Sequence, residues 1–420
     1  MPSAPMKTLK GLLLIILLSN TCIQAQDRVI EQLLKANPSY FKQLTDNPSK
    51  YRLQILYTQI DRDASNQATF TTHAYRVDAN EYFYPASTVK LAASVLALEK
   101  INQLKIDKNT TFQTLKNRPT QLEVLRDTSA ANGLPSIAHY IKKILLVSDN
   151  EAYNRLYEFL GQKNFNKKMA DKGFEGVRFT HRLQTSIPLL ENQYTNPVQF
   201  VNEKGEVIWR QKEQFNKKQI QSPNPLQTIL GKGVMNDSGR ISMNPVAFGF
   251  KNAYPLQAQH DFLKRLMFPS AYDAKERFNL TEEDYRFLYR YMSAYPTESK
   301  KPSYSADSTI GPAYCKFILY GGDKNAQLNS DVRIFNKVGD AYGFLLDNAY
   351  FVDFKNKVEF MVTATIYCNE DEIFNDDKYE YDSVGFPFFK HLGEVIYQHE
   401  LSRPKANLPN LDQLKFTYSD

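Results

Sequence analysis

Ser87-Thr88-Val89-Lys90 opens an Ala/Leu-rich stretch that continues through residues 91–98. The apolar run predicts a helix, and Pro85 is a typical start signal for one. Residues three apart lie on one face of a helix, so the Ser87 hydroxyl and the Lys90 amine are expected to be neighbours. A serine hydroxyl needs a base within reach to act as a nucleophile, and burial lowers the pKa of a lysine toward values at which its amine accepts a proton. The pair is therefore a candidate for nucleophilic catalysis.

Two other Ser-x-x-Lys patterns occur, at Ser39 to Lys42 and at Ser402 to Lys405. The first lies in a polar, charged segment, and the second contains Pro404, which breaks a helix. Only Ser87 opens an apolar run that would bury a lysine stem. A helix N-terminus there also favours negative charge that develops nearby.

Two further motifs follow in order along the chain. Ser148-Asp149-Asn150 begins 61 residues after Ser87, and Lys337-Val338-Gly339 begins 189 residues after Ser148. Taken singly, the first could be a helix cap before residues 151–160 and the second a solvated strand segment. In this order, the three motifs supply the parts that acyl transfer to a serine requires.

The ordered set resembles the class A β-lactamases, within the penicillin-recognising serine hydrolases, whose Ser-x-x-Lys, Ser-Asp-Asn and Lys-Thr-Gly motifs occur in this order. The resemblance covers about residues 51–400. It implies an α+β, two-lobe fold with an antiparallel sheet lobe made from both chain ends (about 51–86 and 310–400). The helical lobe is expected at about 87–195 and a long insertion at about 196–306. The active site would lie between the lobes.

Carried over residue by residue, the resemblance implies catalytic roles for four side chains. Ser87 would be the nucleophile and Lys90 its base. Ser148 would pass a proton to the leaving nitrogen, and Lys337 would add the positive charge that tunes the site and attracts a carboxylate.

Three further positions are implied to bind substrate. Asn150 would hold the substrate amide, and Gly339 and Asp340 would lie beside it. The backbone N–H groups of Ser87 and Asp340 would form an oxyanion hole, which can contribute several kcal/mol to the transition state.

The sequence departs from the family at two places. In these enzymes an Arg-Leu-rich loop carries a glutamate directly before a proline, and that glutamate activates water for deacylation. Here residues 182–188 read Arg-Leu-Gln-Thr-Ser-Ile-Pro, which puts Ile187 at that position; Glu191 is the nearest alternative base. Val338 replaces a threonine whose hydroxyl would bind the substrate carboxylate. We therefore predict a hydrolase that forms an acyl-enzyme readily and deacylates slowly.

Three functions remain open on these residues. The first is hydrolysis of a β-lactam or related amide. The second is a D-alanyl peptidase or another peptidoglycan or ester acyl hydrolase of the same fold, which Ile187 and Val338 favour. The third is a non-catalytic cell-wall binding protein.

Residues 1–25 read as a secretory signal peptide, with Lys7 and Lys10, an apolar run over 11–18 and a small-residue cleavage site ending at Ala25. The run is too short to span a bilayer, and the residues before Cys22 make a poor lipoprotein signal. Residues 26–420 are thus expected as a periplasmic or secreted monomer without a membrane span.

The net charge is +6, and because the signal carries two lysines and no acid, its removal lowers the charge to +4. The basic residues are dispersed, which predicts no nucleic-acid partner and does not oppose an anionic small-molecule substrate. No Cys/His cluster has metal-ligand spacing, so neither a metal nor a cofactor is expected. The acid-rich residues 369–382 predict a solvated loop.

Alternating patterns predict a hairpin around residues 63–66 and strands at 313–320, 332–338, 342–354 and 357–367, with Asp340-Ala341 as the turn between two of them. Helical patterns dominate from 87 to about 160. In the insertion, residues 198–210 read as a hairpin with Trp209, and the aromatic stretch around 285–291 as a helix that either packs in the core or offers a binding surface. Cys315 and Cys368 lie in apolar segments, either paired or as buried free thiols.

Overall fold

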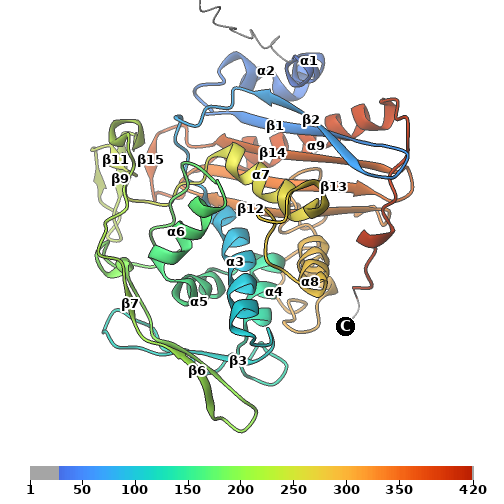
Figure 1. Ribbon diagram of the computed structural model, residues 1–420. Helices are drawn as coiled ribbons and strands as arrows, with labels where there is room; N and C mark the ends of the chain where they lie inside the picture. Colours follow the sequence, from blue (N-terminus) through green and yellow to red (C-terminus); the bar gives the residue numbers. More distant parts are fainter. Residues whose placement is uncertain (1–27, 419–420) are drawn as a thin grey trace, which may run out of the picture.

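The computed structural model describes residues 28–418. Its main sheet has five antiparallel strands in the order β12-β13-β14-β1-β2 (Figure 1). The strands are β1 (Gln54–Arg62), β2 (Ala68–Tyr75), β12 (Val332–Ala341), β13 (Phe344–Asp353) and β14 (Val358–Tyr367). Strands from both ends of the chain therefore form one sheet, as predicted.

Both faces of this sheet are covered. On one side lie α1 (Val29–Ala36), α2 (Pro38–Asp46) and α9 (Phe386–Ser402), and on the other lie α7 (Leu256–Met267) and the helical lobe (Figure 1). Every residue of β13 and β14 is consequently buried. Neighbours on β14 alternate between the two cores: Phe360 and Val362 pack under α9, and Met361 packs toward the helical lobe.

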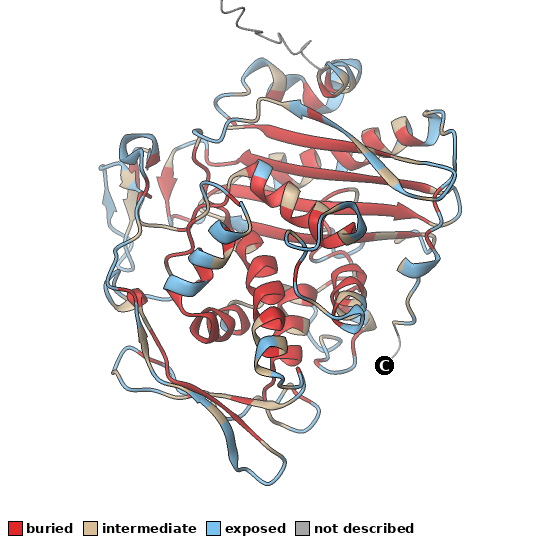
Figure 2. Cartoon of the chain, in the orientation of Figure 1, coloured by how far each residue is buried: buried red, intermediate tan, exposed pale blue. Residues whose placement is uncertain are grey.

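The helical lobe is built around α3, which is buried along most of its length (Figure 2). Around it lie α4, α5 and α6, and α8 lies against β12. The helices are α3 (Val89–Leu104), α4 (Ile137–Val147), α5 (Asn150–Leu160), α6 (Gln162–Asp171) and α8 (Glu282–Ser293). The predicted α+β architecture, with a sheet lobe from both chain ends and a helical lobe between them, is confirmed.

A small sheet interrupts the stretch predicted as helical between residues 87 and 160. It has the strand order β3-β5-β6, with β3 (Thr111–Thr114), β5 (Val198–Val201) and β6 (Val207–Gln211). Phe112 of β3 packs with its ring centroid 5.4 Å from Phe159 and 5.1 Å from Phe200, so burial of an aromatic side chain fixes this strand. The hairpin predicted for residues 198–210 is confirmed as β5 and β6.

The remaining strands are short and lie outside both main elements of the fold. They are β4 (Tyr194–Thr195), β7 (Gln214–Phe215), β8 (Ile229–Leu230), β9 (Gly233–Met235), β10 (Ile241–Ser242), β11 (Val246–Ala247) and β15 (Ile373–Phe374). The division of the chain at residues 86, 195 and 306 stays a prediction.

The prediction of a strand at residues 313–320 is wrong. The segment forms successive turns, with Gly321 N–H donating to Phe317 O (2.7 Å) and Gly322 N–H to Lys316 O (3.0 Å). Its apolar residues, among them Ile318, are buried in the core under α9. Burial, and not a β pattern, explains the apolar composition.

The predicted turn between β12 and β13 is displaced by two residues. β12 continues through Ala341, which pairs with Phe344, and the turn is Tyr342-Gly343. Both turn residues have positive φ (55° and 77°), as a two-residue hairpin loop that matches the strand twist requires. Gly343 supplies one of these conformations without cost.

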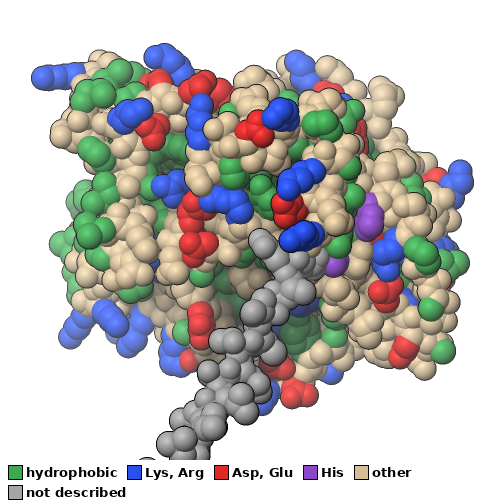
Figure 3. Space-filling model, turned by 90° about the horizontal axis from the view of Figure 1, so that it is seen from above, with side chains coloured by type: hydrophobic (Ala, Val, Ile, Leu, Met, Phe, Trp, Pro, Cys, Tyr) green, Lys and Arg blue, Asp and Glu red, His purple; other side chains and the backbone are tan. Residues whose placement is uncertain are grey.

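Three further predictions can be compared with the structure. Tyr289 and Tyr291 of α8 are buried in the core, which favours packing over a binding surface for this stretch. Cys315 and Cys368 are both buried free thiols. On the face shown in Figure 3, basic and acidic side chains are intermingled.

Within residues 28–418, no helix has both the length and the apolar character needed to cross a bilayer. In the same residues, no group of three or more His, Cys, Asp and Glu side chains is placed to hold a metal ion. The predicted signal peptide lies outside the described residues.

Gly393 of α9 is expected to be essential to packing. A Cβ at this position would lie 2.3 Å from Leu319 N and 2.7 Å from Leu319 Cα. Although Gly to Ala usually stabilises a helix interior, Gly393→Ala should destabilise the protein by about 1–3 kcal/mol because backbone must move to admit the methyl group. Chemical denaturation would measure this, with the exposed Gln398→Ala in the same helix as a control. Equal stability of the two variants would contradict the close packing of α9 on Leu319.

Candidate active site

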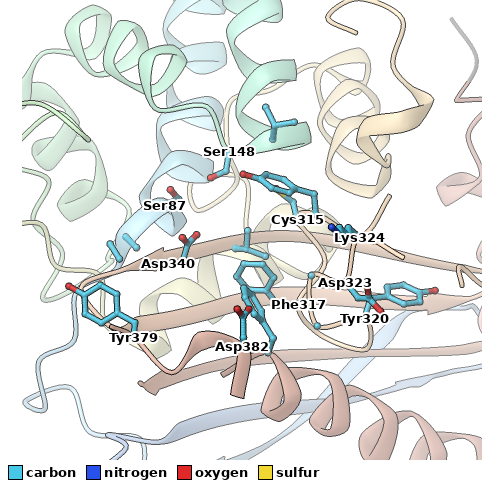
Figure 4. A pocket seen from close by; sticks show the side chains of 18 of the residues that line it. Ser87, Ser148, Cys315, Phe317, Tyr320, Asp323, Lys324, Asp340, Tyr379 and Asp382 are labelled. Carbon is cyan, nitrogen blue, oxygen red and sulfur yellow. The ribbon is translucent and has the colours of Figure 1, made fainter. Parts of the chain in front are cut away.

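Ser87 lies in a tight turn immediately before α3. The turn, Ala86–Thr88, is held by Thr88, whose N–H and Oγ1 both donate to Pro85 O (3.1 and 2.7 Å). Ala86 has a φ of 46°, a left-handed conformation that is unusual for a residue with a side chain. The turn presents the half-buried Ser87 to the cavity between the lobes (Figure 4).

Gly339 allows β12 to lie directly against this turn. A Cβ on Gly339 would be 2.8 Å from Ser87 N and 3.0 Å from both Pro85 O and Thr88 N. Only a residue without a side chain permits this approach. The glycine of the third motif is thus what brings the edge strand to the serine.

Lys90 lies one helical turn after Ser87 and is fully buried. Its Nζ donates to Ser148 O, to Ser148 Oγ (3.2 Å) and to Asn150 Oδ1 (2.7 Å). Burial lowers the pKa of Lys90 well below its usual value, and the positive charge of Lys337 lowers it further. Burial and the Lys337 charge thus favour the neutral amine that a general base requires, although within residues 28–418 no hydrogen bond joins it to Ser87 Oγ.

The Ser148-Asp149-Asn150 segment connects α4 and α5 and directs two side chains at Lys90. Ser148 ends α4 with a φ of 59°, and Asp149 caps α5 by accepting the N–H of Ala152 (2.7 Å). Ser148 and Asp149 of the motif thus also shape the backbone, as the end of one helix and the cap of the next. The sharp change of direction at Ser148 places Ser148 and Asn150 on the same buried amine.

Lys337 approaches Ser148 from the opposite side, on β12. Its Nζ donates to Ser148 Oγ (2.8 Å) and to Val338 O (2.8 Å). Burial lowers the pKa of Lys337, while Cys315, Asp340 and Asp347 oppose this shift by favouring its charged form. The Ser148 hydroxyl therefore connects the two lysines.

Gln184 is a site residue that the sequence analysis did not identify. Its Oε1 accepts a hydrogen bond from Asn150 Nδ2 (2.7 Å), and it lines the cavity with Ser87. Ile187, the position given to the missing glutamate, does not line this cavity. Its position two residues after Arg182 could have identified Gln184 from the sequence. Arg182 anchors the loop through a buried ion pair with Glu158 (2.9 Å).

Glu191 is not brought to the site. Its Oε2 accepts from Thr120 Oγ1 (2.8 Å), and its Oε1 lies 3.6 Å from Arg118 Nη1. It does not line the cavity that contains Ser87. The other predicted site residues, by contrast, meet around that cavity or directly behind its wall.

The cavity has a volume of about 1130 Å³. Its wall includes Ser87, Ser148 and Asp340 near the lysines and extends to Phe317 and Tyr320 on the loop before β12 (Figure 4). Aromatic and charged side chains share the lining, as in sites for polar organic ligands. The space is continuous from the serine to the 309–324 segment.

Behind Lys337 lies a second set of buried charges. Lys316 Nζ donates to Met292 O (2.6 Å), Ile334 O (3.0 Å) and Asn336 Oδ1 (2.7 Å), and burial lowers its pKa to about 8. Asp347 accepts from Asn336 Nδ2 (2.8 Å), and burial raises its pKa to about 6. These bonds connect the cavity-lining loop to β12 and β13.

Residues 42–225 match the model of the beta-lactamase enzyme family. The matched residues include the motifs at Ser87 and Ser148 and end before Lys337. This match confirms the predicted resemblance to penicillin-recognising enzymes. No curated protein matches the chain.

Several solved structures are similar to the chain at low identity. A β-lactamase from Xanthomonas campestris pv. campestris is 14% identical, with 87% of this chain and 98% of that chain covered and a TM-score of 0.49. The chromosome-encoded β-lactamase of Vibrio parahaemolyticus is 15% identical, with 88% and 100% covered and a TM-score of 0.49. An ancestral class A β-lactamase is 15% identical, with 89% and 99% covered and a TM-score of 0.47.

Removal of the Lys337 charge is expected to raise the pKa of Lys90, because that charge is the second contribution to the lowered value, after burial. The Lys90 amine would be followed by NMR of protein labelled with 13C at lysine Cε, with Lys90→Arg to assign the signal. The titration midpoint should move upward in Lys337→Met. It should stay in place in Lys390→Met, which alters another cavity-lining lysine. An unchanged midpoint in Lys337→Met would contradict the coupling.

Proposed function

We propose that this chain is a penicillin-recognising serine hydrolase that opens a β-lactam or related amide through an acyl-enzyme on Ser87. The observation that carries the proposal is the buried Lys90 amine, one turn from Ser87, with its pKa lowered by burial and by Lys337. A desolvated amine of this kind is a base for a neighbouring hydroxyl. The carbonyl group would bind at the mouth of the turn that contains Ser87.

Acylation begins when the neutral Lys90 amine accepts the Ser87 hydroxyl proton as Oγ bonds to the carbonyl carbon. The charge that develops on the carbonyl oxygen would be met by the N–H groups of Ser87 and Asp340. Asp340 lies opposite Leu345, one pair beyond the Ala341–Phe344 pair at the hairpin turn. This is a non-hydrogen-bonded position, so its N–H points away from β13, and β12 is the edge strand beside the Ser87 turn.

Collapse of the tetrahedral intermediate breaks the C–N bond and leaves an ester on Ser87. The leaving nitrogen takes a proton from Ser148 Oγ, which is replenished from Lys90 or Lys337 through the hydrogen bonds at 3.2 and 2.8 Å. Asn150, held by Lys90, would orient the substrate amide. Lys90, Ser148 and Lys337, which carry the proton to the leaving nitrogen, are thus joined by hydrogen bonds.

Within residues 28–418, the position given to the deacylation base does not hold a carboxylate. Gln184 occupies the place beside Asn150 that faces the cavity, and an amide cannot take a proton from water. The acyl-enzyme is therefore expected to persist. A D-alanyl peptidase or another peptidoglycan or ester acyl hydrolase is the second candidate, favoured by Gln184 and by a cavity of about 1130 Å³ that continues well beyond Ser87.

Incubation with a fluorescent penicillin should add one acyl group to the intact protein, at Ser87. Intact-mass spectrometry would detect the adduct, which Ser87→Ala should abolish. Ser402→Ala, in another Ser-x-x-Lys sequence, should leave it unchanged. A D-Ala-D-Ala peptide in parallel separates the two catalytic candidates. The absence of an adduct with either probe would refute both and favour the non-catalytic binding protein.

Gln184→Glu should accelerate turnover of a chromogenic cephalosporin by at least tenfold, since a positioned general base contributes roughly 10²–10⁴-fold. The carboxylate would accept the same Asn150 hydrogen bond and leave an oxygen for water. Ile187→Glu, which does not line the cavity, is the matched control and should have no such effect. Rapid multiple turnover by the unaltered protein, lost in Ser87→Ala, would overturn the slow-deacylation proposal.

A further inference from the structure

A second cavity, of about 730 Å³, shares no lining residue with the one at Ser87. Its wall is formed by residues 78–83 and 253–255, by parts of the 173–178 and 222–228 segments, and by one side of α7 from Gln257 to Arg265. A volume of this size is typical of sites for small organic molecules.

Two arginines of this wall are almost fully buried. Arg178 and Arg265 are 7% and 8% exposed. Arg178 Nε donates to Lys251 O (3.1 Å), and Arg265 Nη1 donates to Lys172 O (2.8 Å). Arg178 Nη2 and Arg265 Nε are buried and have no hydrogen-bond acceptor. Buried donors without acceptors are rare in proteins, and a buried charge without a counter-charge is costly.

Aromatic rings hold both guanidinium groups at the cavity wall. The guanidinium carbon of Arg178 is 5.4 Å from the centre of the Tyr82 ring. That of Arg265 is 4.5 Å from Phe174 and 5.4 Å from Tyr272. Contact with a ring face stabilises the cation but does not use its in-plane N–H groups. Those groups are the ones that bind carboxylates.

The N-terminus of α7 adds positive potential at the same cavity. Pro255 precedes the helix without a side-chain cap, and Gln257 and Ala258 of its first turn line the cavity. The free N–H groups of a first helical turn favour an anion.

The acidic residues of the lining are occupied by other groups or lie in solvent. Asp261 accepts from Gln257 Nε2 (2.9 Å) and is 3.3 Å from Lys264, and Glu81 accepts from Gln54 Nε2 (3.1 Å). Asp78 accepts from Asn80 N (2.8 Å), and Glu175 is exposed. Within residues 28–418, none of them forms an ion pair with Arg178 or Arg265. Their presence favours a ligand with one negative charge over a dianion.

We propose that this cavity binds a small organic monocarboxylate. The carboxylate accepts hydrogen bonds from the guanidinium groups of Arg178 and Arg265, and the apolar body of the ligand lies against the surrounding aromatic rings. Binding supplies the counter-charge that the two buried cations lack. The proposal does not depend on catalysis at Ser87.

Benzoate and its neutral analogue benzamide are matched probes for this site. In calorimetric titrations of the whole protein, benzoate should bind at least tenfold more tightly than benzamide, because only the carboxylate offers a charge to the arginines. Arg178→Gln and Arg265→Gln should each weaken benzoate binding at least tenfold. Lys390→Gln, in the cavity at Ser87, should leave it unchanged.

Equal affinity for the two probes, or benzoate binding retained in both glutamine variants, would overturn the proposal. Crystals of the unaltered protein soaked in 4-bromobenzoate give a result that does not depend on whether the variants fold. An anomalous bromine peak in the cavity beside Arg178 and Arg265 supports the proposal. A peak only in the cavity at Ser87, or no peak in either, refutes it.

Discussion

The hydroxyl of Ser148 lies between two buried amines, and the site depends on the repulsion between them. Its oxygen is 3.2 Å from Lys90 Nζ and 2.8 Å from Lys337 Nζ, so the two nitrogens are at most 6.0 Å apart. Two positive charges at that distance repel by about 3 kcal/mol at an effective dielectric constant of about 20. Asp347 and Asp340 favour the charge on Lys337, and burial and Lys337 together oppose the charge on Lys90. The pKa of both lysines is lowered, and it is lowered further at Lys90, so Lys90 is the better base of the two.

This arrangement requires β12 to stay against the Ser87 turn. Gly339 permits the contact, and the buried network behind β12 maintains it. Lys316 joins Met292 of α8 to Ile334 and Asn336 of β12, and Asn336 continues to Asp347 on β13. Removal of one member of a buried charged network leaves its partner without compensation, at a cost of roughly 3–5 kcal/mol. β12, which carries Lys337, is thus held in place by hydrogen bonds that connect it with both α8 and β13.

The sequence indicated which residues the fold brings together at the candidate site, because the second and third motifs also have structural roles. Ser148-Asp149-Asn150 turns the chain between two helices, and Gly339 allows a strand to approach Ser87, so the same residues determine position and reactivity. The main sheet could be predicted from alternating apolar residues at both ends of the chain.

The turns at residues 313–320 could not be predicted. Their apolar side chains are buried, and buried turns have no periodicity that distinguishes them from a strand. Gln184 was missed because the sequence analysis located the position of the deacylation base by Pro188 and therefore chose Ile187. The buried ion pair between Arg182 and Glu158 instead determines where the loop reaches the site.

The polarity of the hydrogen bonds around Asn150 determines what Gln184 can do. Lys90 donates to Asn150 Oδ1, so the Asn150 amide nitrogen must donate in turn, and it does so to Gln184 Oε1. Within residues 28–418, Gln184 Nε2 has no hydrogen-bond acceptor and can contact a ligand, and an amide NH₂ is only a donor. A water molecule bound there would receive a hydrogen bond and would not lose a proton. A substrate carbonyl or carboxylate oxygen, in contrast, is well matched to such a donor. Gln184 is therefore suited to holding the acyl group of the proposed intermediate in place.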